Sequence, residues 1–145
     1  MKIYSLDRCK LKFNPEQIFN VLTDFQRYPE WWPKIIHFKN FKIINGTQKI
    51  YVKPVFASGF LWEMTNISKY GKIVISYADG AYKGTGTWRI YPQNGKTNIS
   101  YEIHLKINDK FTLALSKFIN IEKMHSKMML VVFKKLEKHL DTLIN

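Results

Sequence analysis

The chain has 145 residues and a formal net charge of +12, from 23 Lys and Arg against 11 Asp and Glu. Hydrophobic residues make up 46% and aromatic residues 15%, which excludes intrinsic disorder and supports one domain over residues 1–145. No apolar run approaches the ~20 residues that a membrane-spanning helix needs. We expect a cytoplasmic protein, because the sequence starts without the apolar core of a signal peptide and Cys9 is its one cysteine.

The positive charge leaves two interpretations open. A strongly basic protein can bind nucleic acid or an anionic membrane surface. However, only Arg8, Arg27 and Arg89 are arginines, and the lysines are spread along the chain without a block of five or six. Because arginine is the better residue for bidentate phosphate recognition, we favour a compositional bias toward lysine. A nucleic-acid partner is therefore disfavoured, although the +12 charge does not exclude it.

The N-terminal third is predicted to contain a strand, a short helix and a tight corner. Residues 2–12 alternate loosely, as a strand does. Asn14, Pro15 and Gln17 then form the start of a helix with a capping box, and this helix should end near residue 24 or 25. The stretch QRYPEWWPKI carries two prolines, which restrict it to a helical turn and a corner. Its tryptophans, Trp31 and Trp32, either anchor this corner or form the lip of an entrance.

Residues 35–107 are predicted to form six antiparallel strands joined by hairpins. The pairs Asn45-Gly46, Asp79-Gly80 and Asn94-Gly95 are strong turn signals. The expected strands span 35–44, 47–57, 59–68, 72–78, 81–91 and 97–107. The last one alternates apolar and polar residues cleanly, so one face of the sheet should be packed and the other solvated.

Residues 109–144 contain no Gly or Pro and are predicted to form a long amphipathic helix, whose first turns can be separate. Lysines lie on one side of it. The apolar stripe on the other side contains Phe111, Ala114, Phe118, Ile121, His125, Met128, Met129, Val132, Leu136, Leu140 and Leu143.

This order of elements gives an α+β arrangement, with helices covering one face of an antiparallel sheet. It resembles the helix-grip fold of the START-like (SRPBCC) superfamily. The segments FNPEQIFNVLTDFQRYPEWWP, GAYKGTGTWRIYP and IEKMHSKMMLVVFKKLEKHL are similar to parts of its polyketide cyclase/dehydrase family. The resemblance implies a curved sheet of about seven strands wrapped around a long C-terminal helix, with two short helices after the first strand. It also implies a cavity between sheet and helix for an apolar or polycyclic molecule.

Glycines in the strand at 81–91 bear on that cavity. Tyr82, Gly84, Gly86, Trp88 and Ile90 share one face by period two. Glycines in a strand mark either a bend or a close approach. We favour a bend that leaves room for a ligand over simple close packing against the helix.

His125 and Glu122 are the candidate catalytic residues, because a Glu-x-x-His pair lies on one helix face where it can orient a ligand or move a proton. A histidine that is simply hydrogen-bonded in the core is the favoured alternative. No metal site and no cofactor are predicted, since a di-metal bundle needs two such motifs.

The candidate cavity lining combines large aromatic, apolar and polar side chains, any one of which can equally be core filling. The set is Trp62, Met64, Tyr77, Tyr82, Trp88, Tyr101, Ile103, Phe118, Glu122, His125 and Met129. The predicted function is the binding of a small hydrophobic molecule such as a lipid, an aromatic or a polyketide. The alternatives are a polyketide cyclase or dehydratase using His125, Glu122 and a cavity tyrosine, or a basic interaction module similar to quinone- or ribosome-associated relatives.

Overall fold

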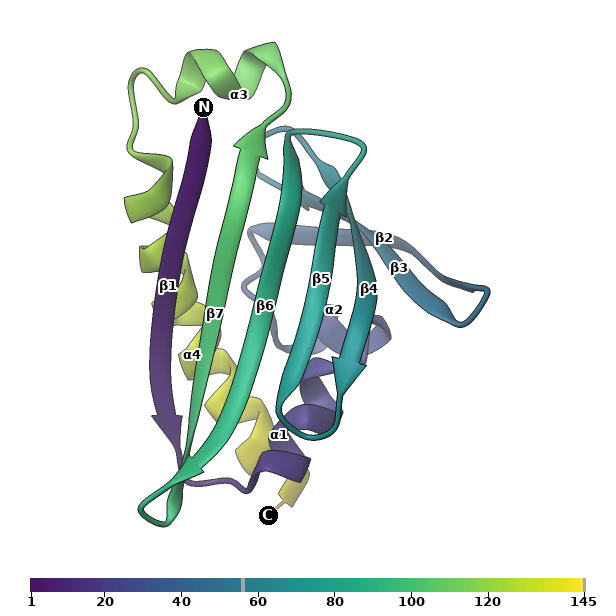
Figure 1. The fold of residues 1–145 in the computed structure, drawn as a ribbon, viewed down its shortest axis with the longest axis vertical. Coiled ribbons are helices and arrows are strands. Elements are labelled where there is room, and N and C mark those ends of the chain that lie inside the picture. Colours follow the sequence, from purple (N-terminus) through teal and green to yellow (C-terminus); the bar gives the residue numbers. More distant parts are fainter. Residues whose placement is uncertain (56, 145) are drawn as a thin grey trace.

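A computed structural model of the protein describes residues 1–55 and 57–144. Seven strands form one antiparallel sheet in the order β1-β7-β6-β5-β4-β3-β2 (Figure 1). The strands are β1 (Lys2–Leu11), β2 (Ile36–Ile44), β3 (Thr47–Pro54), β4 (Phe60–Ser68), β5 (Lys72–Ala78), β6 (Tyr82–Gln93) and β7 (Lys96–Ile107). The helices are α1 (Pro15–Leu22), α2 (Tyr28–Trp31), α3 (Lys110–Leu115) and α4 (Ile121–Ile144), with a 3-10 turn at Phe25–Arg27.

The predicted fold class is confirmed. Local signals in the sequence explain where its helices and turns begin. At α1, the Asn14 side chain accepts a hydrogen bond from the backbone N–H of Gln17 at 2.9 Å, and the Gln17 side chain accepts one from the backbone N–H of Asn14 at 3.0 Å. The helix ends at Leu22, earlier than expected, because Thr23 caps it and donates its hydroxyl to the Phe19 carbonyl.

The hairpin signals also form turns. Asn45 and Asn94 have φ near +51° and the following Gly46 and Gly95 have φ +77°, the left-handed pair that a type I′ turn requires. The third strand ends at Pro54 rather than at 57, and Phe56 lies outside the described residues.

The long C-terminal helix is two helices, which corrects the continuous apolar stripe of the prediction. Residues 116–120 separate α3 from α4, and Asn120 starts the second helix by accepting a hydrogen bond from the backbone N–H of Lys123. The stripe holds over most of α4, where Met129, Val132, Leu136 and Leu140 are buried, but Leu143 near its end is 52% exposed. The stripe fails before α4, since Phe111 is 57% exposed and Phe118 is 87% exposed.

The helices lie on one side of the sheet, and the other side faces solvent (Figure 1). In the view of Figure 1, α4 runs behind β1 and β7, and it packs most closely on β1. The strands β2 and β3 turn across the far end, so the sheet curls toward the helices. Buried side chains of the core fill the space between these layers, where we expected a cavity. None of the helices in the described ranges combines the length and apolar character needed to cross a membrane.

Gly86 is a position of close approach. A Cβ atom built there would overlap the Tyr101 hydroxyl and lie 3.0 Å from the Tyr77 ring. The two tyrosines therefore occupy the space above this glycine. Closed packing, the alternative that we did not favour from the sequence, is the arrangement at this point of the strand.

Replacement of Gly86 by alanine should lower the free energy of unfolding by about 1–3 kcal/mol, because the added methyl group overpacks the core against Tyr101. Chemical denaturation measures this. Gly71→Ala is the matched control, since its nearest new contact is an ordinary 3.5 Å to the Ile90 carbonyl. Equal stability of the two variants would contradict the close approach at Gly86.

Candidate functional site

The sheet and α4 bring most of the predicted lining residues together in the core. Seven of them are at most 5% exposed: Trp62, Met64, Tyr77, Trp88, Tyr101, Ile103 and Met129. Tyr82 and His125 are partly exposed at its margin. Two predicted residues lie elsewhere, because Phe118 projects from the loop between α3 and α4 and Glu122 is exposed.

Two tyrosine hydroxyls meet in this interior. The Tyr77 and Tyr101 hydroxyl oxygens are 2.6 Å apart, and both residues are buried. Burial raises the pKa of both phenols well above the ordinary value, so both stay protonated at neutral pH. One hydroxyl donates to the other, and the proton of the second is left free. The pair can therefore donate one hydrogen bond to an oxygen atom placed beside it.

His125 lies against this tyrosine pair, with its ring stacked on that of Tyr101 at a centroid distance of 6.1 Å. Its Nδ1 atom is 3.7 Å from Asp7 Oδ2, which suits charge attraction but is too long for a hydrogen bond. The Nδ1 atom has no hydrogen-bond partner among the described residues. Both side chains are largely buried, at 14% and 12% exposed.

Two serines complete a polar cluster around Asp7. The Ser5 hydroxyl donates to Asp7 Oδ2 at 2.8 Å and lies 3.0 Å from the Ser126 hydroxyl. Burial acts to raise the pKa of Asp7, but the polar contacts from His125, Ser5 and Ser126 outweigh it and lower the pKa below its ordinary value. The carboxylate is consequently ionised at neutral pH, inside the protein and next to an imidazole.

Asp7, and not Glu122, is thus the carboxylate beside His125. Glu122 accepts a hydrogen bond from the backbone N–H of Tyr4 at 2.8 Å, at the free edge of β1. The alternation of side chains along β1 is the sequence signal that points to Asp7. Within β1, Ile3, Ser5, Asp7, Cys9 and Leu11 alternate onto one face, and its end members are buried.

A second group of polar atoms without partners lies among the tryptophans. The indole N–H groups of Trp31, Trp32, Trp62 and Trp88 are buried and have no acceptor in hydrogen-bonding geometry among the described residues. Trp62 and Trp88 do lie near the hydroxyls of Tyr77 and Tyr28, whose pKa values they act to lower against the larger effect of burial. Trp31 and Trp32 are at most 4% exposed, so they anchor the corner and do not form a lip.

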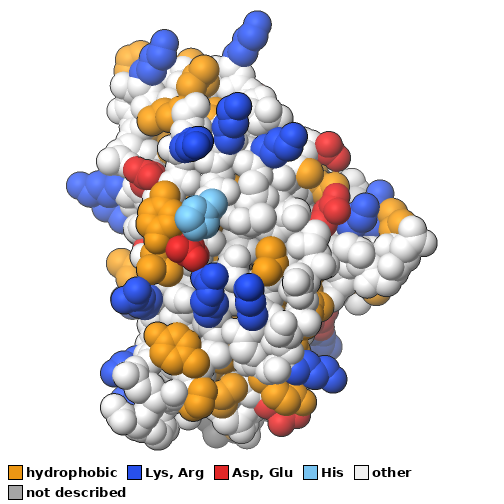
Figure 2. Space-filling model, viewed as in Figure 1, with side chains coloured by type: hydrophobic (Ala, Val, Ile, Leu, Met, Phe, Trp, Pro, Cys, Tyr) orange, Lys and Arg blue, Asp and Glu red, His pale blue; other side chains and the backbone are white. Residues whose placement is uncertain are grey.

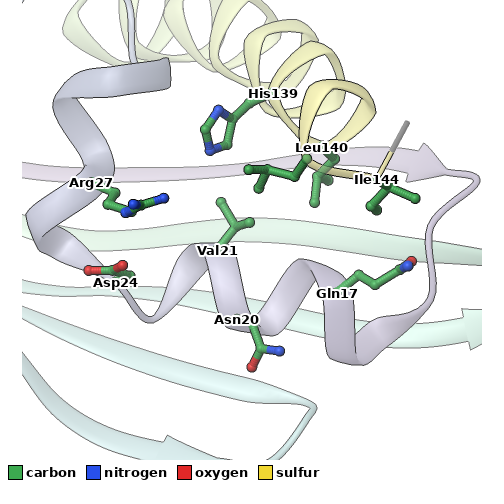
Figure 3. Close-up of a pocket in the computed structure, with 9 residues that line it drawn as sticks. Gln17, Asn20, Val21, Asp24, Arg27, His139, Leu140 and Ile144 are labelled. Atoms are coloured by element: carbon green, nitrogen blue, oxygen red, sulfur yellow. The ribbon is translucent and has the colours of Figure 1, made fainter.

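Two surface clefts flank α4. The first, of about 350 Å³, lies between α1 and the C-terminal end of α4 (Figure 3). Val21 and Leu140 give it an apolar floor, and Arg27 and His139 lie at its edge. Burial lowers the pKa of His139; Glu30 opposes this effect and Arg27 adds to it. The second cleft, of about 360 Å³, lies between the start of β1 and the start of α4, where Ile3, Phe118 and Ile121 line it.

A curled antiparallel sheet packed on a long C-terminal helix, with an aromatic interior between them, defines the class of helix-grip proteins. Residues 11–137 match the family described as polyketide cyclase / dehydrase and lipid transport. The match covers most of the chain, which therefore belongs to this START-like (SRPBCC) family. No match was found among curated protein sequences.

Solved structures agree on the fold at low sequence identity. A START superfamily protein from Mycobacterium smegmatis is 14% identical, with a TM-score of 0.73 over 97% of this chain and 98% of its own. A conserved protein from Geobacillus kaustophilus is 16% identical, with a TM-score of 0.77 over 97% and 96%. The Zhui aromatase/cyclase from Streptomyces sp. R1128 is 8% identical, with a TM-score of 0.73 over 100% and 97%.

The low pKa of Asp7 gives a testable dependence of stability on pH. Because the folded state holds the Asp7 proton less tightly than the unfolded chain, the stabilising contribution is fully present above the ordinary value of 3.8. It is lost as the pH falls through the folded pKa. Denaturation curves should be measured from about pH 2 to about pH 6, a range around the ordinary pKa of aspartate. They should show a steeper loss of stability on acidification in the wild type than in Asp7→Asn.

The matched control for this measurement is Asp24→Asn. Asp24 is another partly buried aspartate, but among the described residues no hydrogen bond or ion pair joins its side chain to a serine or histidine, as happens at Asp7. Parallel curves for the wild type and Asp7→Asn would contradict the polar cluster.

Proposed function

We propose that this protein binds a small apolar molecule, aromatic or lipid-like and carrying a carbonyl-type oxygen, in the interior between the sheet and α4. The observation that carries the proposal is the buried Tyr77–Tyr101 hydroxyl pair next to an imidazole. A core that serves packing alone is built more cheaply from phenylalanine and leucine, because buried polar groups cost free energy unless they are paired. The spare hydroxyl proton suits an acceptor oxygen on an otherwise apolar ligand.

The aromatic residues around the pair support a flat, apolar ligand. Trp62 and Phe60 contact Tyr77 at ring-centroid distances of 5.9 and 5.2 Å, and Trp88 contacts Tyr101 at 4.6 Å. Rings at such spacing favour stacked and edge-to-face contacts with another aromatic ring. Met129, which is fully buried in the same core, has a flexible side chain that adapts to ligands of different shape.

We place the route to this interior at α3. Thr112 is the buried residue of that helix, so displacing α3 exposes little apolar surface. At the start of β6, the partly buried Tyr82 contacts Phe60 at 5.6 Å, and Phe60 stacks on Tyr77. Segments with few buried side chains open at low free-energy cost. Ligand binding in this proposal therefore requires α3 to move and the aromatic side chains to repack.

The test compares two probes of nearly equal shape, 2-acetylnaphthalene and 2-ethylnaphthalene, of which only the first has an acceptor oxygen. Replacing only one of the two tyrosines leaves the other hydroxyl with its proton free to donate. The informative variant is therefore the double change Tyr77→Phe/Tyr101→Phe. It should weaken binding of 2-acetylnaphthalene roughly 2- to 12-fold, the worth of one hydrogen bond. Binding of 2-ethylnaphthalene should stay within about twofold, because a hydrocarbon accepts no hydrogen bond. NMR titration of the tryptophan indole signals measures both affinities.

The control is Tyr70→Phe/Tyr91→Phe, which removes two hydroxyls from exposed tyrosines. The double change at the interior pair replaces both partners of one hydrogen bond, so it should leave the fold nearly as stable as before. The proposal is wrong if the wild type binds neither probe, or if the interior variant weakens both probes equally.

A second function, proton transfer from a carbon next to a carbonyl group, is favoured by the Asp7–His125 pair. An ionised aspartate beside His125 stabilises the imidazolium that forms when the histidine takes a proton. The tyrosine hydroxyl would then donate to the enolate oxygen. This is the first step of ring closure in a polyketone.

That step is measurable without knowing the natural substrate. In deuterium oxide, the wild type should speed the exchange of the methyl protons of 2-acetylnaphthalene above the buffer rate, and His125→Ala should return it to that rate while staying folded by circular dichroism. His104→Ala, on the exposed face of β7, is the control. An unchanged exchange rate with bound probe leaves binding as the function and excludes this step.

A further inference from the structure

We propose that the end of the molecule formed by α3 docks on the surface of a lipid bilayer that contains anionic phospholipids. The docking surface combines apolar side chains of the α3 tip (Phe111, Leu113 and Phe118) with lysines that surround them. This inference does not depend on a ligand in the interior, because it rests on exposed residues alone.

The α3 tip exposes large apolar side chains. Phe118 is 87% exposed, Phe111 57% and Leu113 43%, and they lie within eight positions of one another in the sequence. In Figure 1 this segment stands at the end of the sheet, beyond the last residues of β7. Isolated exposed apolar residues need no explanation, but two phenylalanines and a leucine on one protruding segment mark an interaction site.

Lysines adjoin the α3 tip on the outer face of the sheet. Lys2 is directly opposite Lys106, and Lys106 is directly opposite Lys83, so three lysines form a row across β1, β7 and β6. All three are exposed, and Figure 2 shows Lys and Arg side chains gathered across this face near the α3 end. Like charges directly opposite in a sheet destabilise it. This lysine row therefore costs stability unless an anionic partner meets it.

Two more lysines lie within the docking surface. Lys110 begins α3 and Lys117 precedes Phe118, and both are exposed. The acidic groups nearby are engaged with backbone N–H groups, since Asp109 accepts from Thr112 at 2.6 Å and Glu122 accepts from Tyr4 at 2.8 Å. Asp79, in the turn between β5 and β6, is the remaining acid of the adjoining segments. Five lysines against three acids leave the surface positive.

This combination fits a bilayer better than other anionic partners. Stable attachment to a membrane surface takes two contributions, burial of apolar side chains at the headgroup boundary and attraction of basic residues to anionic lipids. Single-stranded nucleic acid is bound in positively charged grooves that follow its backbone, and arginine is the better residue for its phosphates, whereas this surface is a projecting tip without arginine. A second copy of the chain would bring its own five lysines against these.

Sedimentation with vesicles tests the proposal on the whole protein. The wild type should bind phosphatidylcholine vesicles that contain about 30% phosphatidylserine and should bind pure phosphatidylcholine much more weakly. Phe111→Ser/Phe118→Ser should weaken binding at least about tenfold, by losing the apolar contact. Lys2→Gln/Lys83→Gln/Lys106→Gln should weaken it about fivefold per lysine, since a basic residue near an anionic leaflet is worth about 1 kcal/mol.

Matched controls distinguish binding through this surface from non-specific adsorption of the protein to vesicles. Ile43→Ser/Ile44→Ser changes two exposed apolar residues in the β2–β3 hairpin, and Lys134→Gln/Lys135→Gln/Lys138→Gln removes three exposed lysines toward the other end of α4. Both should bind like the wild type in about 0.1 M salt, where charges beyond ~10 Å are screened. Equal losses in test and control variants would overturn the proposal. Tighter binding to transfer RNA than to the vesicles, unaffected by Phe111→Ser/Phe118→Ser, would overturn it in favour of nucleic acid.

Discussion

The pairing of β1 with β7 is the constraint on which both proposed surfaces depend. Ten residue pairs fix its register, from Lys2 opposite Lys106 to Leu11 opposite Thr97. Within that register Asp7 lies opposite Tyr101 and faces the interior, where α4 presents His125. A slip of one residue would turn Asp7 to solvent and Leu6 inward, because side chains alternate across a strand. The first and last strands along the chain, β1 and β7, thus bring the buried polar cluster together, although their paired residues are about 90 positions apart in sequence.

The same register places charge on the opposite face of the sheet. Odd-numbered residues of β1 carry the interior cluster, and the even-numbered Lys2 joins the lysine row on the outside. Near the middle of that face, Glu102 offsets part of the charge, accepting hydrogen bonds from Arg89 at 2.7 Å and from the Tyr4 hydroxyl at 2.9 Å. No such acid stands opposite the lysine row in the paired positions of β1, β7 and β6. Positive charge is therefore balanced at the centre of the face and left unbalanced toward α3.

Local signals in the sequence predicted most of the fold, because they act over a few residues. The capping box at Asn14 and the Asn-Gly turns need no information from the rest of the chain, and each formed as expected. We expected that the first turns of the C-terminal helix can be separate, but the position of the break was not predicted, since that region has no Gly or Pro; its signal is the helix-starting Asn120. Placing Phe118 on the buried stripe followed from that error. Glu122 was paired with His125, and Asp7 was overlooked, for another reason: the partners of both carboxylates depend on how α4 lies on β1, which no local pattern encodes.

The interior and the docking surface are joined through one short stretch of chain. Ile107 ends β7 inside the core, Asn108 holds the backbone with a 2.7 Å hydrogen bond from its N–H to the Ala81 carbonyl, and α3 follows two residues later. Because α3 buries little of its own surface, contacts made by Phe111 and Phe118 outside the protein compete with few contacts inside it. A bilayer that bound these side chains more tightly in a displaced position of α3 than in the observed one would favour the displaced position, and by linkage it would lower the cost of opening the aromatic interior. Docking and ligand uptake would then be coupled through this helix, with a strength set by the difference in membrane affinity between its two positions.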